Sequence, residues 1–506
     1  MLASLPVVRG VAARLPQGAE LGADWVVAPQ RELRVASAPA SVTNGPVSTL
    51  RETLGLPADG NEGRGVTVAV VDTGIADVPD LAARVSRRVD VTGTGAGDGF
   101  GHGTFMAGLI AGSGAASGGA YRGVAPAAKL IDVKVADARG ETDLITVLRG
   151  LQWVSEHSRE VQVLNLSLSS NSPLPYQIDP LTQALEALWR HGVTVVVPSG
   201  NDGPDKGSVT SPGSDPVLLT AGGLDESGTA DRRDDVVAAW SGRGPTWQGD
   251  AKPDLVAPGG HLVSLRSPGS VADTDNPQAR IGNDYFRGSG SSMATAVTSG
   301  VVARTLAVQP KLRPDAVKNL LTTTAYTAPG LTRAGGAGAG ALDAGRALSS
   351  APTWRMSRSE AQFDRDTAAI GRDAKRWMAL EQAIVNGDRA GAAAAWQKLS
   401  AGSRDWAARA WVQLDPETRD WAARAWVTEG WGGGGDGTAE EWAARAWVAR
   451  AWVARAWVSE DWSARAWVKD EWAARAWVAR AWVTNDWAAR AWVSGTWSAR
   501  AWTWQP

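Results

Sequence analysis

Short apolar runs, rich in β-branched residues, alternate with longer amphipathic stretches between residues 61 and 350. Such runs are typical of strands buried on both faces of a parallel sheet. They predict strands at Val66–Val71, Leu130–Val135, Val161–Leu168, Val193–Val197 and Val217–Thr220. Helical spacing of apolar residues predicts helices at Asp143–His157 and at Pro180–Arg190, which Gly192 would end. Strands alternating with helices predict an α/β fold, a parallel sheet with helices on both faces.

The chain of 506 residues is longer than one hydrophobic core usually serves, so we expect several domains. Residues 1–60 show no clean period, and we interpret them as an N-terminal extension or a partial pro-segment. Residues 61–350 are the α/β domain. Residues 351–400 are charged, rich in Ala and nearly free of Pro, which predicts a helical linker. Residues 401–506 form a repetitive tail rich in Trp.

Composition narrows the range of functions. A formal net charge of −2 argues against a nucleic-acid-binding protein, which would carry a basic excess. Without cysteine, the sequence offers no disulfide, thiolate nucleophile or cysteine-zinc site. No apolar run reaches the roughly 20 residues of a membrane span. The N-terminal segment is a poor signal peptide because Arg9 interrupts its short apolar stretch, and a start site further upstream is the alternative.

Two motifs supply a carboxylate and an imidazole. Asp72 stands in Val-Asp-Thr-Gly at the end of the first predicted strand, where open α/β sheets place functional groups. Aspartic proteases share Asp-Thr-Gly but need two such carboxylates, and the chain has no second copy. His102 stands in Gly-His-Gly-Thr before an apolar, helix-like run. The other three histidines lie at predicted helix ends or in a loop, which leaves His102 as the candidate base.

Two further motifs supply an amide and a hydroxyl. Asn201 stands in Gly-Asn-Asp-Gly after a predicted strand. Its local composition favours an ordinary turn, but an Asn amide can also donate to an oxyanion. Ser292 stands in Gly-Ser-Gly-Ser-Ser-Met-Ala, before the apolar run Ala294–Val308 that predicts a helix. The start of a helix favours developing negative charge, although a loop ending in an N-cap serine is the alternative.

Taken together, these motifs resemble those of the subtilisin-like serine peptidases, in the same order Asp, His and Ser, over about residues 61–350. Three other segments are also similar to blocks of that family: Arg122–Pro126, Ala251–Gly259 and Gly338–Leu348. The resemblance implies a subtilisin-like fold and the activity of a serine endopeptidase, a hydrolase of peptide bonds.

The resemblance also implies a role for each residue. Ser292 would be the nucleophile that forms the acyl-enzyme, His102 the general acid and base, and Asp72 the group that orients His102. Asn201 and the Ser292 backbone N–H would hold the oxyanion. A protein or peptide substrate would pair in extended form with one strand. The substrate-binding residues implied are Ser167, Leu168, Ser169 and Gly200.

Several properties of the family extend the expectation. The resemblance implies secretion or attachment to the cell surface, no required cofactor, and structural calcium in many members. The candidate calcium loop Asp273–Asn276 has no convincing ligand pattern, so we interpret it as a solvated acidic loop, with structural calcium as the alternative. Phe105 replaces a second His that is common after His-Gly-Thr, and Ser169-Ser170 replaces Gly-Gly. Neither change removes a catalytic group.

Tryptophan recurs every five residues from Trp442 to Trp502, in a unit close to Trp-Ala-Ala-Arg-Ala. A period of five fits neither one face of a helix nor one face of a strand. Helix, stacked solenoid and disorder stay open, and acidic residues four positions before arginine, such as Asp405 before Arg409, favour the helix. Because Trp is both apolar and hydrogen-bonding, we expect the tail to bind a cell-envelope, membrane-interface or protein partner, with simple tethering or self-association as the alternative.

Two functions of different classes therefore stand. The first is a serine endopeptidase. The second is a catalytically latent subtilisin-like scaffold that acts as a binding protein through its tail. The four intact residues Asp72, His102, Asn201 and Ser292 favour the enzyme, because nothing else requires all of them.

Overall fold

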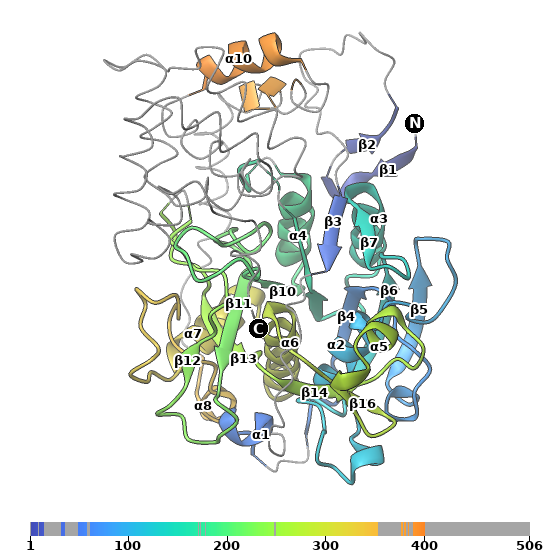
Figure 1. Ribbon diagram of the computed structural model, residues 1–506, viewed down its shortest axis with the longest axis vertical. Helices are drawn as coiled ribbons and strands as arrows, with labels where there is room; N and C mark the ends of the chain where they lie inside the picture. Colours follow the sequence, from blue (N-terminus) through green and yellow to red (C-terminus); the bar gives the residue numbers. More distant parts are fainter. Residues whose placement is uncertain are drawn as a thin grey trace, which may run out of the picture. The chain divides into compact units, whose positions relative to one another are not determined.

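Eight strands form the central sheet in the computed structural model (Figure 1). Their order is β12-β11-β10-β8-β4-β6-β5, and β13 pairs with β11 off this path. The strands are β4 (Thr67–Asp72), β5 (Val85–Asp90), β6 (Lys129–Lys134), β8 (Val163–Leu166), β10 (Thr194–Pro198), β11 (Leu219–Asp225), β12 (Val236–Val237) and β13 (Leu255–Pro258). Among the described residues, every pairing in this sheet is parallel except that of β11 with β12. The predicted α/β fold is thus confirmed.

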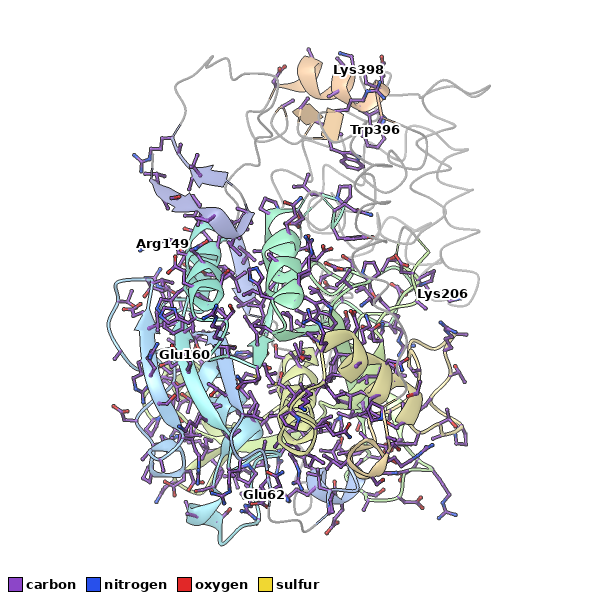
Figure 2. The ribbon with its side chains drawn as sticks, turned by 180° about the vertical axis from the view of Figure 1, so that it is seen from behind. Glu62, Arg149, Glu160, Lys206, Trp396 and Lys398 are labelled. Carbon is purple, nitrogen blue, oxygen red and sulfur yellow. The ribbon has the colours of Figure 1, made fainter. Side chains whose placement is uncertain are left out.

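The structure describes residues 2–352 except 9, 15–31, 36–48, 58–60, 171, 173, 178 and 247–248, together with 376, 377, 379, 380, 383 and 388–399. The predicted tail 401–506 and most of the predicted linker lie outside these residues. The chain divides into two units, and the second consists of Leu21–Pro29, Asn171–Pro175 and Thr367–Pro506. In that second unit, α10 (Arg389–Gln397) carries the buried Trp396 (Figure 2).

Burial of β4 explains its apolar sequence. The side chains of Val68, Ala69, Val70 and Val71 have no exposed surface, as expected for a strand covered on both faces. The five predicted strands correspond to β4, β6, β8, β10 and β11. One prediction was too long: Val161–Leu168 divides at Ser167, because Leu168 leaves the central sheet and begins β9 (Leu168–Ser169).

Helices cover both sides of the sheet. The main ones are α2 (His102–Ala111), α3 (Leu144–Glu156), α4 (Pro180–Arg190), α6 (Ser291–Val308) and α7 (Pro314–Thr324). Figure 1 shows α3 and α4 on one side of the strands and α2 and α6 on the other. Asp143 and Asp179 cap the two predicted helices α3 and α4, because their side chains accept hydrogen bonds from Thr146 N and Leu181 N.

Smaller elements complete the described residues. They are α1 (Leu50–Thr53), α5 (Val271–Asp275), α8 (Ala344–Ser349), β1 (Ala3–Leu5), β2 (Gly10–Ala12), β3 (Glu32–Val35), β7 (Glu141–Asp143), β14 (Leu262–Leu265), β15 (Arg280–Ile281) and β16 (Tyr285–Gly288), with short 3₁₀ turns at 6–8, 79–81, 115–117 and 277–279. The strands form three small sheets, β1-β2, β14-β16-β15 and β7-β3-β9. No helix in the described part of the chain has the length and apolar character needed to span a membrane.

Part of the N-terminal extension is built onto the α/β domain. The β1-β2 hairpin and the turn between its strands pack against α3 and α4. Val7 N donates to Gln152 Oε1 at 2.8 Å, and Leu5 and Val7 are buried. The next described segment, β3, is the central strand of the sheet β7-β3-β9. The extension is therefore attached at two places on the α/β domain.

Candidate active site

Asp72 and His102 form a buried pair at the carboxyl end of β4. Asp72 is the last residue of β4, and His102 is the first residue of α2. His102 Nδ1 and Asp72 Oδ1 are 2.8 Å apart, and both side chains are buried. Thr73 N also donates to Asp72 Oδ1 at 2.8 Å, which fixes the carboxylate. The predicted carboxylate and imidazole are thus in direct contact.

The glycine after His102 makes this contact possible. A Cβ atom at Gly103 would lie 2.1 Å from the carbonyl oxygen of Gly74, which is far inside van der Waals contact. Only glycine lets the first turn of α2 approach the loop after Asp72 so closely. The Gly-His-Gly pattern therefore reflects the packing that the Asp72–His102 contact requires.

Ser292 lies in the first turn of α6 and has no exposed surface. Its Oγ donates to the carbonyl oxygen of Ser167 at 3.3 Å, and Ser167 Oγ donates to the Ser292 carbonyl at 3.4 Å. In the described structure, His102 Nε2 is buried and has no hydrogen-bond partner. That nitrogen is the atom that would receive a proton from a serine nucleophile. Contacts between α2 and α6 join the helices that carry His102 and Ser292.

Asn201 is oriented by the residue that precedes Ser292. Its Oδ1 accepts hydrogen bonds from Ser291 N and from Ser291 Oγ, each at 2.9 Å. The carbonyl end of the amide is thereby held, and the NH₂ end is left to donate. The segment follows β10, and Gly200 before it has a φ of 92°, a conformation that favours glycine. Asn201 is thus more than a turn residue, because its side chain is anchored at the start of α6.

The predicted substrate strand is already paired in the structure. On β9, Ser169 lies opposite Arg34 and Leu168 opposite Val35, in an antiparallel register. On its other edge β3 pairs with β7, where Leu33 lies opposite Thr142. Leu33 is only 1% exposed. This strand was not predicted from the sequence, because its local signal is only the short alternation Glu-Leu-Arg-Val.

A buried carboxylate on β6 holds the loop after Asp72. Asp132 Oδ2 accepts from Ile75 N at 3.1 Å and from Arg88 Nη1 at 3.0 Å. Burial raises the pKa of Asp132 to about 7, and the neighbouring Arg88 guanidinium acts in the opposite direction. This residue has a structural part in the site, because the hydrogen bonds to its Oδ2 come from a backbone N–H and an arginine.

The candidate calcium loop contains a short helix and a buried aspartate that is paired with two arginines. Residues 271–275 form α5, and Asp273 is 2% exposed. Its Oδ1 pairs with Arg266 Nε at 2.5 Å and with Arg280 Nε at 2.7 Å. Hydrogen bonding from Arg266 holds the pKa of Asp273 well below its usual range. The interpretation as a solvated acidic loop is wrong for Asp273. A carboxylate that is already paired with two arginines also does not fit a calcium ligand.

Within the described residues, no group of three or more His, Cys, Asp or Glu side chains could hold a metal ion.

Comparisons with known proteins agree with this geometry. The sequence model of the subtilase family, peptidase S8, matches residues 63–340. Serine protease AprX of Bacillus subtilis is 44% identical over 269 residues, which are 51% of this chain and 61% of that protein. Subtilisin Savinase of Lederbergia lenta is 34% identical over 279 residues, which are 55% of this chain and 90% of that protein.

The crystal structure of fervidolysin from Fervidobacterium pennivorans, described as a keratinolytic enzyme related to subtilisin, matches with a TM-score of 0.49 and 24% identity, over 64% of this chain and 52% of that one. The family match covers more than half of the chain, and all four predicted site residues lie within it. The chain therefore belongs to the subtilase family. It matches less than two thirds of the length of AprX.

Proposed function

We propose that this protein is a serine endopeptidase that hydrolyses peptide bonds through an acyl-enzyme on Ser292. The observation that carries the proposal is the buried contact between Asp72 Oδ1 and His102 Nδ1, which leaves Nε2 without a partner among the described residues. An imidazole held in this way is oriented for proton transfer at its other nitrogen. Membership of the subtilase family supports the same reaction.

These positions support the following mechanism. Ser292 Oγ attacks the scissile carbonyl carbon while His102 Nε2 takes its proton, and Asp72 stabilises the imidazolium that forms. The Asn201 NH₂ group and the Ser292 backbone N–H donate to the oxyanion. His102 then gives its proton to the leaving amine. In the second half of the reaction, water attacks the acyl group while His102 takes a proton from the water, and His102 then returns that proton to Ser292 Oγ. No step requires a cofactor or a metal ion.

We propose that the substrate is an extended peptide that lies between β7 and β9. Ser167, Leu168, Ser169 and Gly200 would line its path. The pairing of β3 with both strands supports this, because it demonstrates that an extended segment fits there with backbone hydrogen bonds on both edges. Since β3 belongs to the chain itself, residues 1–60 would act as a pro-segment that must leave before a substrate can bind.

The tail and the location of the protein complete the proposal. Family resemblance supports a secreted or cell-surface enzyme. The Trp-rich repeat of residues 401–506 would bind a cell-envelope, membrane-interface or protein partner, because tryptophan combines apolar contact with a hydrogen-bond donor. The nearly neutral charge of the whole chain gives no reason to expect nucleic acid as a partner. No observation in the site favours a latent scaffold over the enzyme.

The test is labelling with a fluorophosphonate probe, with casein digestion measured on the same samples. Wild type, Ser292→Ala and Ser349→Ala are compared, and Ser349 is the matched control because it is a serine on α8. Labelling and digestion lost only in Ser292→Ala would support the proposal. If the folded wild type is not labelled, the same test is repeated on Arg34→Pro, a variant designed to release β3. Absence of labelling in that variant too would contradict the proposed function.

A further inference from the structure

The carboxylate of Asp98 connects the two segments that carry the catalytic carboxylate and imidazole. Asp98 Oδ1 accepts from Thr73 Oγ1 at 2.8 Å and from Gly101 N at 2.6 Å. Asp98 Oδ2 accepts from Thr104 N at 2.8 Å and from Thr104 Oγ1 at 2.7 Å. Both oxygens are therefore saturated by donors from the loop after β4 and from the start of α2.

One arm of this network joins the sequence neighbours of the catalytic pair. Thr73 follows Asp72, and Gly103 follows His102. Gly103 N donates to Thr73 Oγ1 at 2.9 Å, and the same hydroxyl donates to Asp98. The Thr73 hydroxyl is thus used as both acceptor and donor, and it fixes the first turn of α2 against the end of β4.

A second arm ties the same two segments a few residues further along the chain. Ala76 N donates to Thr104 Oγ1 at 2.9 Å, and that hydroxyl donates to Asp98 Oδ2. A displacement of α2 relative to the loop 73–76 would therefore break bonds in both arms. Hydrogen-bond networks of this kind restrict the relative movement of the elements they join.

The backbone of Asp98 and of the next residue is also held by hydrogen bonds. Ser267 Oγ donates to the Asp98 carbonyl oxygen at 2.8 Å. Val271 N donates to Gly99 O at 2.9 Å, so that α5 fixes the loop just after Asp98. The side chain is 6% exposed. Burial raises the pKa of the Asp98 carboxyl, and the four hydrogen bonds from Thr104, Gly101 and Thr73 act in the opposite direction.

We propose that Asp98 is a positioning residue, which sets the separation and orientation of Asp72 and His102 through Thr73 and Thr104. The inference rests on the proposed peptidase function. Asp98 acts through other residues, because its carboxylate oxygens are occupied by four internal donors. Precise alignment matters in such a site, since a misplacement of about 1 Å can cost a reaction roughly a hundredfold in rate.

The test uses the Thr73 arm, because Val, Ser and Thr differ little in size. Thr73→Val removes the hydroxyl that links Asp98 to Gly103, and Thr73→Ser keeps it. We expect Thr73→Val to lower kcat by about tenfold to a hundredfold, the effect of one lost hydrogen bond to a charged group. KM should stay within about twofold, and Thr73→Ser should recover most of the lost rate. Asp98→Asn, which retains only one acceptor oxygen, should lower kcat at least as much.

Thr92→Val is the matched control, because Thr92 Oγ1 donates at 2.6 Å to the carboxylate of the exposed Asp90, which ends the strand β5, two strands from Asp72 in the sheet. It should leave kcat unchanged. A folded Thr73→Val enzyme with the wild-type kcat, or one whose loss Thr73→Ser does not recover, would overturn the proposal.

A second readout does not depend on turnover. In a Ser292→Ala background, the proton on His102 Nδ1 should give a low-field NMR resonance from its bond to Asp72. The resonance should broaden or shift in Thr73→Val and be retained in Thr73→Ser. If both the wild type and Arg34→Pro prove inactive, the proposed function fails, but this measurement still decides the positioning role. An unchanged resonance in Thr73→Val would overturn it.

Discussion

Arg34, which precedes the peptidase domain in the sequence, lies opposite Ser169 on one side and opposite Glu141 on the other. Each of these partners belongs to a strand next to the proposed substrate path. The backbone of a peptide substrate would make the same kind of antiparallel pairs. At the same time Ser292 has no exposed surface. These observations support a chain whose own strand β3 occupies the proposed substrate path.

Release of β3 should therefore increase the affinity for peptides. Proline at position 34 removes a backbone N–H from a strand that is paired on both edges, and Arg34→Ala keeps that N–H. In a Ser292→Ala background, which prevents cleavage, Arg34→Pro should bind a fluorescent peptide at least about fivefold more tightly than Arg34→Ala. Fluorescence anisotropy measures both dissociation constants. Equal affinity in the two variants would argue that β3 does not compete with substrate.

The contact between Ser291 and Asn201 predicts an effect on kcat without an effect on KM. Ser291→Ala removes one of the two donors that hold Asn201 Oδ1, while its backbone N–H stays in place. We expect kcat to fall several-fold, because the amide NH₂ would be less well aimed at the oxyanion. Asn201→Ala should cost about 10²–10³ in kcat, a magnitude that comes from subtilisin itself.

Steady-state kinetics on a chromogenic peptide separates the two constants. An interaction made mainly in the transition state lowers kcat and leaves KM nearly unchanged. If Asn201→Ala instead raised KM at constant kcat, Asn201 would be a ground-state binding residue and the oxyanion role would be wrong.

Glu226, just after β11, predicts a loss of stability as the pH rises from 4.5 to about 8. It is 5% exposed, and among the described residues its Oε2 has no hydrogen-bond partner. Burial, followed by the nearby charges of Asp225 and Asp235, raises the pKa of Glu226 from 4.5 to about 8. The folded state therefore holds the proton more tightly than the unfolded state. Its contribution to stability is complete below pH 4.5 and is lost as the pH rises towards about 8.

Glu226→Gln keeps the size and the neutral charge of the protonated form and cannot ionise. The Tm of wild type should fall by several degrees more than that of Glu226→Gln between pH 5 and pH 9, since a shift of this size corresponds to a few kcal/mol. Differential scanning calorimetry at both pH values checks this. Parallel Tm curves for the two proteins would indicate that Glu226 ionises without cost.

The sequence predicted the strands and helices whose formation depends on residues close together in the chain. The strand β4 follows from four consecutive residues without exposed surface, and α3 and α4 follow from apolar spacing with Asp caps. The contact between Asp72 and His102 was also predictable, because Gly103 is required by the approach to Gly74 and leaves a recognisable motif around His102. Each of these features depends on residues that are close together in the sequence.

Pairings between distant residues were not predictable in the same way. β3 has four residues, and its place depends on partners at 141–143 and 168–169. Asp273 has its arginine partners seven positions away on either side, and both lie outside the short helix α5 that carries Asp273. Asp98 carries no motif of its own, because its importance comes from Thr73 and Thr104. Such residues need the fold before their role can be argued.

The tryptophan repeat predicts that catalysis and attachment can be separated. All four proposed catalytic residues lie between Asp72 and Ser292, so deletion of residues 401–506 should leave kcat/KM on a small peptide within about twofold of the full chain. Binding to isolated cell envelopes, measured by co-sedimentation, should be lost. A chain whose tail keeps its composition but not its five-residue spacing is the matched control. If this scrambled tail still binds, composition rather than periodicity carries the attachment. If the deleted chain sediments as the full chain does, the tail is not an envelope-binding module, and vesicles and protein partners become the next probes.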